Sequence, residues 1–131
     1  MIMIKKSVLI WLAIIPLAVL NGFLREEVIV PLIGLKYALP VSGMALCLLI
    51  FLVTLTFLPR IGKGNGKTYR NIGIVWVILT VVFEFAMGLF AGYTFGELLN
   101  AYDITTGNLW LLVVVFTGAA PWLVAKLKRI I

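Results

Sequence analysis

A lone carboxylate, Glu84, lies near the middle of an otherwise apolar stretch that runs from Ile74 to Phe95. In a spanning helix it would be roughly 20 Å from one end and about 16 Å from the other. A carboxyl group at that depth must be protonated or paired, and residues of this kind often mark paths for protons and ions. We therefore expect Glu84 to handle a proton or a cation. The alternative interpretation is a permanently neutral carboxyl group that hydrogen-bonds helices together.

Polar residues in the other apolar stretches are candidate partners for Glu84. Asn21 and Arg25 are four residues apart and share one helix face, and the long arginine side chain can reach inward. Pro121 cannot donate to the carbonyl of Thr117, which leaves a polar notch at roughly the depth of Glu84. We expect one polar cluster that binds or transports a solute and contains no metal. Its predicted members are Glu84, Asn21, Arg25, Glu26, Thr117 and Thr80.

Glycines near these residues predict close helix packing. Gly88 and Gly92 form a G-x-x-x-G pair on the face of Glu84, where the backbone of another helix can approach. The carboxyl group would then meet a helix contact and not lipid tails. The predicted helix-packing residues are Gly88, Gly92, Gly22 and Gly118.

The triplet Arg25-Glu26-Glu27 allows a second kind of chemistry at one end of the first apolar stretch. An arginine followed by two carboxylates at a membrane mouth could hold a cation or a polar headgroup, or supply an acid and a base for a reaction on a lipid. The plainer interpretation is that these charges mark the point where a helix leaves the lipid.

Composition determines the elements that must position these residues. The chain has 131 residues, of which 63% are hydrophobic and 12% are charged, too few charges for a water-soluble surface. Four apolar stretches, at about 7–27, 41–59, 72–94 and 108–126, are long enough to cross a bilayer. The sequence predicts an all-α integral membrane protein with one domain, 1–131, folded as a compact four-helix bundle. Its tryptophans, Trp11, Trp76, Trp110 and Trp122, fall near predicted helix ends, where such residues anchor to the interface.

Basic residues predict the orientation of the bundle. If both termini are cytoplasmic, nine Lys and Arg residues lie inside and only Arg25 and Lys36 lie outside, as the positive-inside rule requires. The net charge of +6 then needs anionic lipid headgroups and no nucleic acid. The nine are Lys5, Lys6, Arg60, Lys63, Lys67, Arg70, Lys126, Lys128 and Arg129.

Two outer connections carry their own signals. The segment 25–40 contains Pro31 and Gly34 and is too short to span, so it should lie on the interface or dip into the membrane and return. Thr94 and Glu97 form a T-x-x-E capping box, which predicts a short interfacial helix over about 95–103.

The remaining residue types restrict the function. The chain has no histidine, and its single Cys47 cannot form an intrachain disulfide, so we expect no cofactor. The sequence predicts a multi-pass protein of the cell membrane that transports or conducts a small solute or ion through a site centred on Glu84. A non-catalytic subunit that docks a partner protein is the alternative, and a lipid-modifying enzyme is the third hypothesis. We expect a homo-oligomer or a complex with a partner membrane protein, since four short helices enclose little volume.

Overall fold

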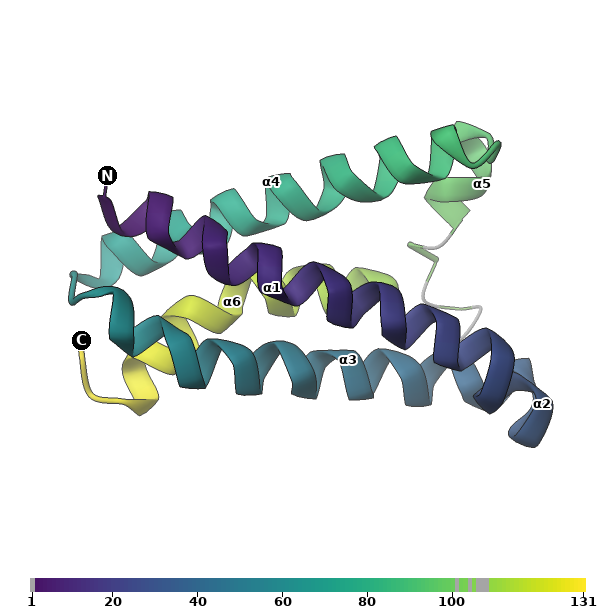
Figure 1. Ribbon diagram of the computed structural model, residues 1–131, viewed down its shortest axis with the longest axis horizontal. Helices are drawn as coiled ribbons and strands as arrows, with labels where there is room; N and C mark the ends of the chain where they lie inside the picture. The colour runs from purple at the N-terminus through teal and green to yellow at the C-terminus, as the bar shows by residue number, and fades with distance from the viewer. Residues whose placement is uncertain (1, 101, 104, 106–108) are drawn as a thin grey trace.

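The computed structural model describes residues 2–100, 102, 103, 105 and 109–131, and within them it is helical without strands (Figure 1). Four helical segments are long and apolar enough to cross a membrane: Ile2–Ile33, Leu35–Ile61, Gly66–Phe90 and Trp110–Leu127. This confirms the predicted all-helical class and the number of spanning helices. The predicted start of the last helix at residue 108 lies outside the described residues.

The first spanning segment is longer than predicted. Helix α1 (Ile2–Leu24) continues through a π-helical turn (Arg25–Ile29) into α2 (Val30–Ile33). The chain breaks only at Gly34, whose φ of 84° lies in the left-handed region that glycine adopts without strain. The segment 25–40 is therefore no separate element, because its first part continues α1 and its last part belongs to α3. Its predicted position at the interface stays a prediction. Pro31 is tolerated because it lies in the first turn of α2, where no backbone donor is required.

The other helices begin and end at identifiable caps. Helix α3 (Leu35–Phe57) runs into a 3-10 turn (Leu58–Ile61). Asn65 caps α4 (Gly66–Phe90) by accepting a hydrogen bond from the Thr68 backbone, which starts this helix earlier than the predicted residue 72.

The predicted outer helix is present and is capped as expected. The Thr94 and Glu97 side chains each accept a hydrogen bond from the other's backbone N–H at 3.1 Å, which confirms the capping box. Helix α5 (Phe95–Asn100) ends before the predicted residue 103. Helix α6 (Trp110–Leu127) completes the bundle.

The four long helices run side by side, so that both termini lie at one end of the bundle together with the α3–α4 turn (Figure 1). Helix α2 and helix α5 lie at the opposite end. Helix α1 packs on α3 and α4, and α6 packs on the same two helices. The nine basic residues that are predicted to lie inside all belong to segments at the terminal end.

The core is densest toward the terminal end. Trp76, Tyr69 and Ile72 of α4 are fully buried there. Two indoles cross from one helix to another: Trp11 Nε1 donates to Thr80 Oγ1 at 2.9 Å, and Trp76 Nε1 donates to the Ser7 carbonyl at 3.2 Å. The proposed interface role of Trp11 and Trp76 is therefore wrong, since both are buried links between α1 and α4.

Helices α4 and α6 approach each other closely at Gly73 of α4 and Gly118 of α6. A methyl group on Gly73 would overlap the backbone carbonyl oxygen of Gly118. A methyl group on Gly118 would lie 2.7 Å from a methyl carbon of Val77. Gly118 thus packs closely, as predicted for it, while its partner Gly73 was not among the predicted residues.

The other predicted packing glycines have different surroundings. Gly92 has a φ of 96° and nothing within 4 Å of a built Cβ, so it ends α4 and packs on no helix. Gly88 packs closely, but on Leu98 of the short helix α5. The nearest atom to Gly22 is the Arg25 guanidinium, at 4.0 Å. The G-x-x-x-G interpretation is wrong because one of its glycines is needed for chain reversal.

Candidate functional site

Glu84 is the acceptor of two hydrogen bonds from other segments of the chain. The Tyr102 hydroxyl donates to its Oε2 at 2.5 Å, and the Trp110 indole N–H donates to the same oxygen at 2.7 Å. The three side chains come from α4, from the segment after α5 and from the first residue of α6. Glu84 therefore ties the C-terminal end of α4 to the chain that leads into α6.

Tyr102 is positioned because α5 folds back on the end of α4. The Phe85 ring of α4 lies 5.2 Å from the Phe95 ring and stacks on the Tyr102 ring at 6.2 Å. Leu98 fills the space left by the missing side chain of Gly88. Burial, and then the hydrogen bond to Glu84, raise the pKa of Tyr102 above its usual range, so its hydroxyl stays a donor.

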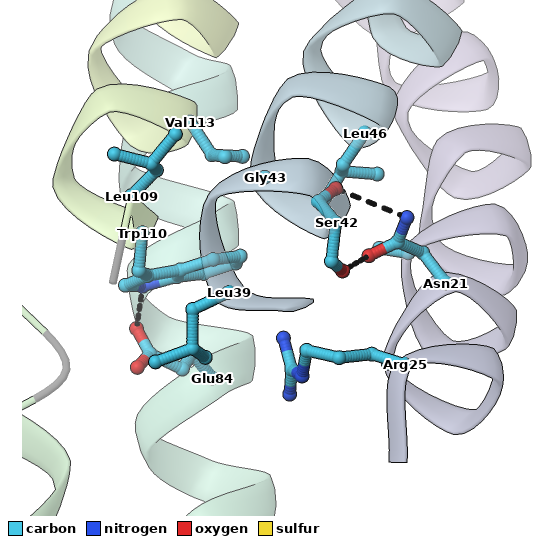
Figure 2. A pocket seen from close by; sticks show the side chains of 12 residues that line it. Asn21, Arg25, Leu39, Ser42, Gly43, Leu46, Glu84, Leu109, Trp110 and Val113 are labelled. Carbon is cyan, nitrogen blue, oxygen red and sulfur yellow. Dashed lines mark hydrogen bonds between the residues drawn. The ribbon is translucent and has the colours of Figure 1, made fainter. Parts of the chain in front are cut away.

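A cavity of about 230 Å³ opens beside Glu84 toward the end of the bundle that lies away from the termini, and we call it the outer cavity for this position (Figure 2). Asn21 of α1 and Ser42 of α3 form its polar back wall. The Ser42 hydroxyl donates to the Asn21 carbonyl oxygen at 2.6 Å, and the Asn21 amide donates to the Ser42 backbone carbonyl at 3.2 Å. The cavity is lined by Ala18, Asn21, Gly22, Arg25, Leu39, Ser42, Gly43, Leu46, Glu84, Leu109, Trp110 and Val113.

Arg25 brings a positive charge to this cavity. Its side chain extends from the α1 side into the space in front of Leu39, and the Glu84 carboxyl group, on the other side, turns toward Trp110 (Figure 2). Arg25 Nε also donates to Glu26 Oε1 at 3.1 Å. The Glu26 side chain is 58% exposed and does not line the cavity, so it orients Arg25 from outside.

A second cavity, also of about 230 Å³, lies deeper and is apolar. Glu84 and Trp110 line both cavities and thus mark their junction. Val19 of α1 is 58% exposed and Met87 of α4 is 53% exposed, which places a mouth of the deeper cavity between these helices on the side of the bundle. Its lining is Ile14, Ile15, Ala18, Val19, Leu46, Ile50, Thr80, Phe83, Glu84, Met87, Trp110, Val113 and Thr117.

The predicted cluster is divided between the two cavities. Asn21 and Arg25 share the outer one with Glu84, whereas Thr80 and Thr117 share the deeper one with it. Thr117 donates to the carbonyl of Val113 in its own helix at 2.7 Å, so its hydroxyl is occupied locally.

Sequence reasoning missed the residues that actually bond to Glu84. Trp110 was interpreted as an interface anchor, and Tyr102 was not singled out as a site residue. The sequence could have indicated this pairing, because a buried indole N–H or phenol O–H needs a hydrogen-bond acceptor, and the Glu84 carboxyl group is a strong acceptor. Ser42 was missed because it lies at the start of the predicted span 41–59, and nothing in the sequence pairs it with Asn21 of another helix.

In the described part of the chain, no three carboxylates or thiols gather as metal ligands. The site offers one carboxylate, one guanidinium and several neutral hydrogen-bonding groups. These suit the recognition of a charged or polar molecule more directly than a covalent reaction. No family model, no curated protein and no solved structure matches this chain.

Proposed function

We propose that the protein transports or conducts a small polar or charged solute across the cell membrane through the site at Glu84. The observation that supports this best is an intramembrane carboxylate at the junction of a polar outer cavity and a deeper apolar one. An intramembrane carboxylate that faces a cavity is typical of solute and proton pathways.

In the proposed mechanism the described conformation is open to one side only. Trp11 and Trp76 tie α1 to α4 between Glu84 and the terminal end, and the buried core there closes the inner half. Pro16 lies in α1 between Trp11 and Asn21, where it removes one helical hydrogen bond. Movement at this point would let the inner part of α1 separate from α4 and release the solute on the other side.

The proposed orientation places both termini in the cytoplasm, because the terminal end carries nine of the eleven basic residues. Cysteine labelling tests this in a Cys47→Ser background. A cysteine at Lys36 should react with an impermeant maleimide from outside intact cells, and a cysteine at Lys63 should react only after lysis. The opposite pattern would reverse the direction of access.

A docking subunit is the second candidate, and one surface favours it. Phe90 at the end of α4 is 91% exposed, and its neighbours Tyr93 and Phe95 are 56% and 59% exposed. This apolar patch could pack on a partner membrane protein or on a second copy of the chain. The lipid-enzyme hypothesis has less support, because Glu26 lies outside the outer cavity.

Flux through proteoliposomes tests the transport function with protons as the first probe. A dye sensitive to pH is trapped inside, and a potassium diffusion potential drives proton entry. The wild type should acidify the lumen faster than protein-free vesicles, and Glu84→Gln should return the rate to background. Glu27→Gln, which neutralises an exposed carboxylate outside the cavity, is the matched control and should behave as the wild type.

Two results would count against this function. Equal proton flux through the wild type and Glu84→Gln would remove Glu84 from the path. No flux through wild-type protein, for protons or for a panel of small cations and anions, would favour the docking subunit.

A further inference from the structure

The two cavities that meet at Glu84 differ in chemistry. Asn21, Arg25 and Ser42 make the outer one polar, and a charged headgroup could replace its water. The deeper one is walled mainly by aliphatic and aromatic side chains, among them Leu46 and Phe83. A single ligand that fills both must therefore have a polar part and an apolar part.

The size of the deeper cavity argues against a purely polar solute. A volume of about 230 Å³ equals roughly seven or eight water molecules, yet cavities lined by aliphatic and aromatic groups tend to stay dry. A hydrated ion would use the outer cavity alone. An alkyl chain taken from water would instead bind about fourfold more tightly for each methylene that enters the deeper cavity. A chain taken from the membrane exchanges lipid tails for cavity walls of similar polarity.

The mouth between Val19 and Met87 gives an apolar chain a route into the deeper cavity. Both residues are exposed on the side of the bundle, which faces lipid tails in a membrane. The outer cavity adjoins Arg25 near the α2 end of the molecule, where headgroups would lie. A molecule already in the outer leaflet could place its chain and its head in the two cavities without leaving the membrane.

Arg25 and Glu84 both line the outer cavity, but the Glu84 carboxyl group turns toward Trp110 and Arg25 is the cation available to a head. A guanidinium group binds phosphate through two parallel hydrogen bonds, and Asn21 offers a neutral amide beside it. We infer that the solute of this site is a phospholipid-like amphiphile, with its phosphate on Arg25 and one alkyl chain in the deeper cavity beside Glu84. This inference rests on the proposed function and names its substrate class.

Quenching of Trp110 fluorescence tests the inference directly. Protein in nanodiscs is titrated with a lysophospholipid whose alkyl chain carries bromine, which quenches an indole in close contact. Trp122 lies about 18 Å further along α6, and its fluorescence is also quenched by brominated lipid around the protein. Binding at the site is therefore measured as the difference in quenching between the wild type and Trp110→Phe. We expect this difference to saturate with the probe.

Two variants and their controls locate the ligand. Arg25→Gln should weaken binding by about tenfold or more, the effect of losing a charge-assisted hydrogen bond, and Lys36→Gln should not. Ala18→Leu, at the junction of the cavities, should weaken binding of the bromolipid, whereas Ala13→Leu on another face of α1 should leave it unchanged. Glycerol phosphate should compete only at concentrations at least a hundredfold higher.

Several results would overturn the inference. Non-saturating quenching would show surrounding lipid only, as would equal quenching in the wild type and Trp110→Phe. Competition by glycerol phosphate as strong as that of the lysophospholipid would show a polar solute. In that case, or if proton flux depends on Glu84 while the bromolipid does not bind, the proposed transport function stands and only its substrate class is wrong.

Discussion

Replacing Gly73 with alanine should disrupt the contact on which α4 and α6 depend. The new methyl carbon would overlap the carbonyl oxygen of Gly118 and lie 3.0 Å from its carbonyl carbon. Because the obstacle is backbone, it cannot rotate away, and the two helices must separate by something on the order of 1 Å. Overpacking of this kind costs up to about 3 kcal/mol, and the better helix propensity of alanine offsets about 1 kcal/mol. We expect a net loss of about 2 kcal/mol.

Two other glycines provide a graded comparison. A methyl group on Gly118 would meet only the Val77 side chain, at 2.7 Å, which can adjust more easily than backbone. A methyl group on Gly96 in α5 would meet nothing within 4 Å, so Gly96→Ala should be neutral or slightly stabilising. The expected order of destabilisation is Gly73→Ala, then Gly118→Ala, then Gly96→Ala.

The assay is equilibrium unfolding in mixed micelles as the fraction of SDS rises, followed by far-ultraviolet circular dichroism. The same shift should disturb the site, because α4 carries Glu84 and α6 carries Trp110, whose hydrogen bond is 2.7 Å long. The fluorescence of Trp110 in Gly73→Ala should therefore differ from that of the wild type. A Gly73→Ala protein as stable as Gly96→Ala would refute the close α4–α6 contact.

Three further predictions concern single hydrogen bonds. Trp11→Phe should destabilise the bundle by about 1 kcal/mol in the same SDS assay, because it removes the donor to Thr80, and Thr80→Val combined with it should add less than its separate effect. The raised pKa of Tyr102 favours the neutral phenol in the folded state, so its stabilisation is present below about pH 10 and is lost at higher pH. The unfolding midpoint of the wild type should therefore fall more steeply above about pH 10 than that of Tyr102→Phe, and parallel curves would contradict this. Thr94→Ala removes the cap of α5 and should cost about 1 kcal/mol, with faster amide hydrogen exchange confined to 95–100.

The sequence predicts those features that depend on one element at a time. Bilayer thickness sets the length of an apolar helix, so four spans follow from four apolar stretches. The Thr94–Glu97 capping box is local and is found where it was predicted. The boundaries near Pro31 could not be predicted, since the effect of proline depends on its position within the helix and the actual break is at Gly34.

Contacts between two elements are harder to predict from the sequence. Tyr102 and Trp110 are 18 and 26 residues from Glu84, and they reach it only because α5 folds back on α4. Gly73 has no glycine four residues away, so the spacing rule that singled out Gly88 and Gly92 does not find it. Spacing identifies glycines on one helix but not the helix that approaches them.

The distribution of hydrogen bonds between helices explains how the proposed site could be coupled to movement. In the inner half, Trp11 and Trp76 hold α1 to α4 through two hydrogen bonds that do not involve Glu84. In the outer half, a single oxygen of Glu84 accepts the bonds from Tyr102 and Trp110. A proton, or a solute that donates a hydrogen bond to this oxygen, would weaken both bonds and loosen α4 from the chain leading into α6. Under the proposed function, the charge state of the site and the attachment of α4 to this chain are therefore coupled, because the same carboxylate serves both.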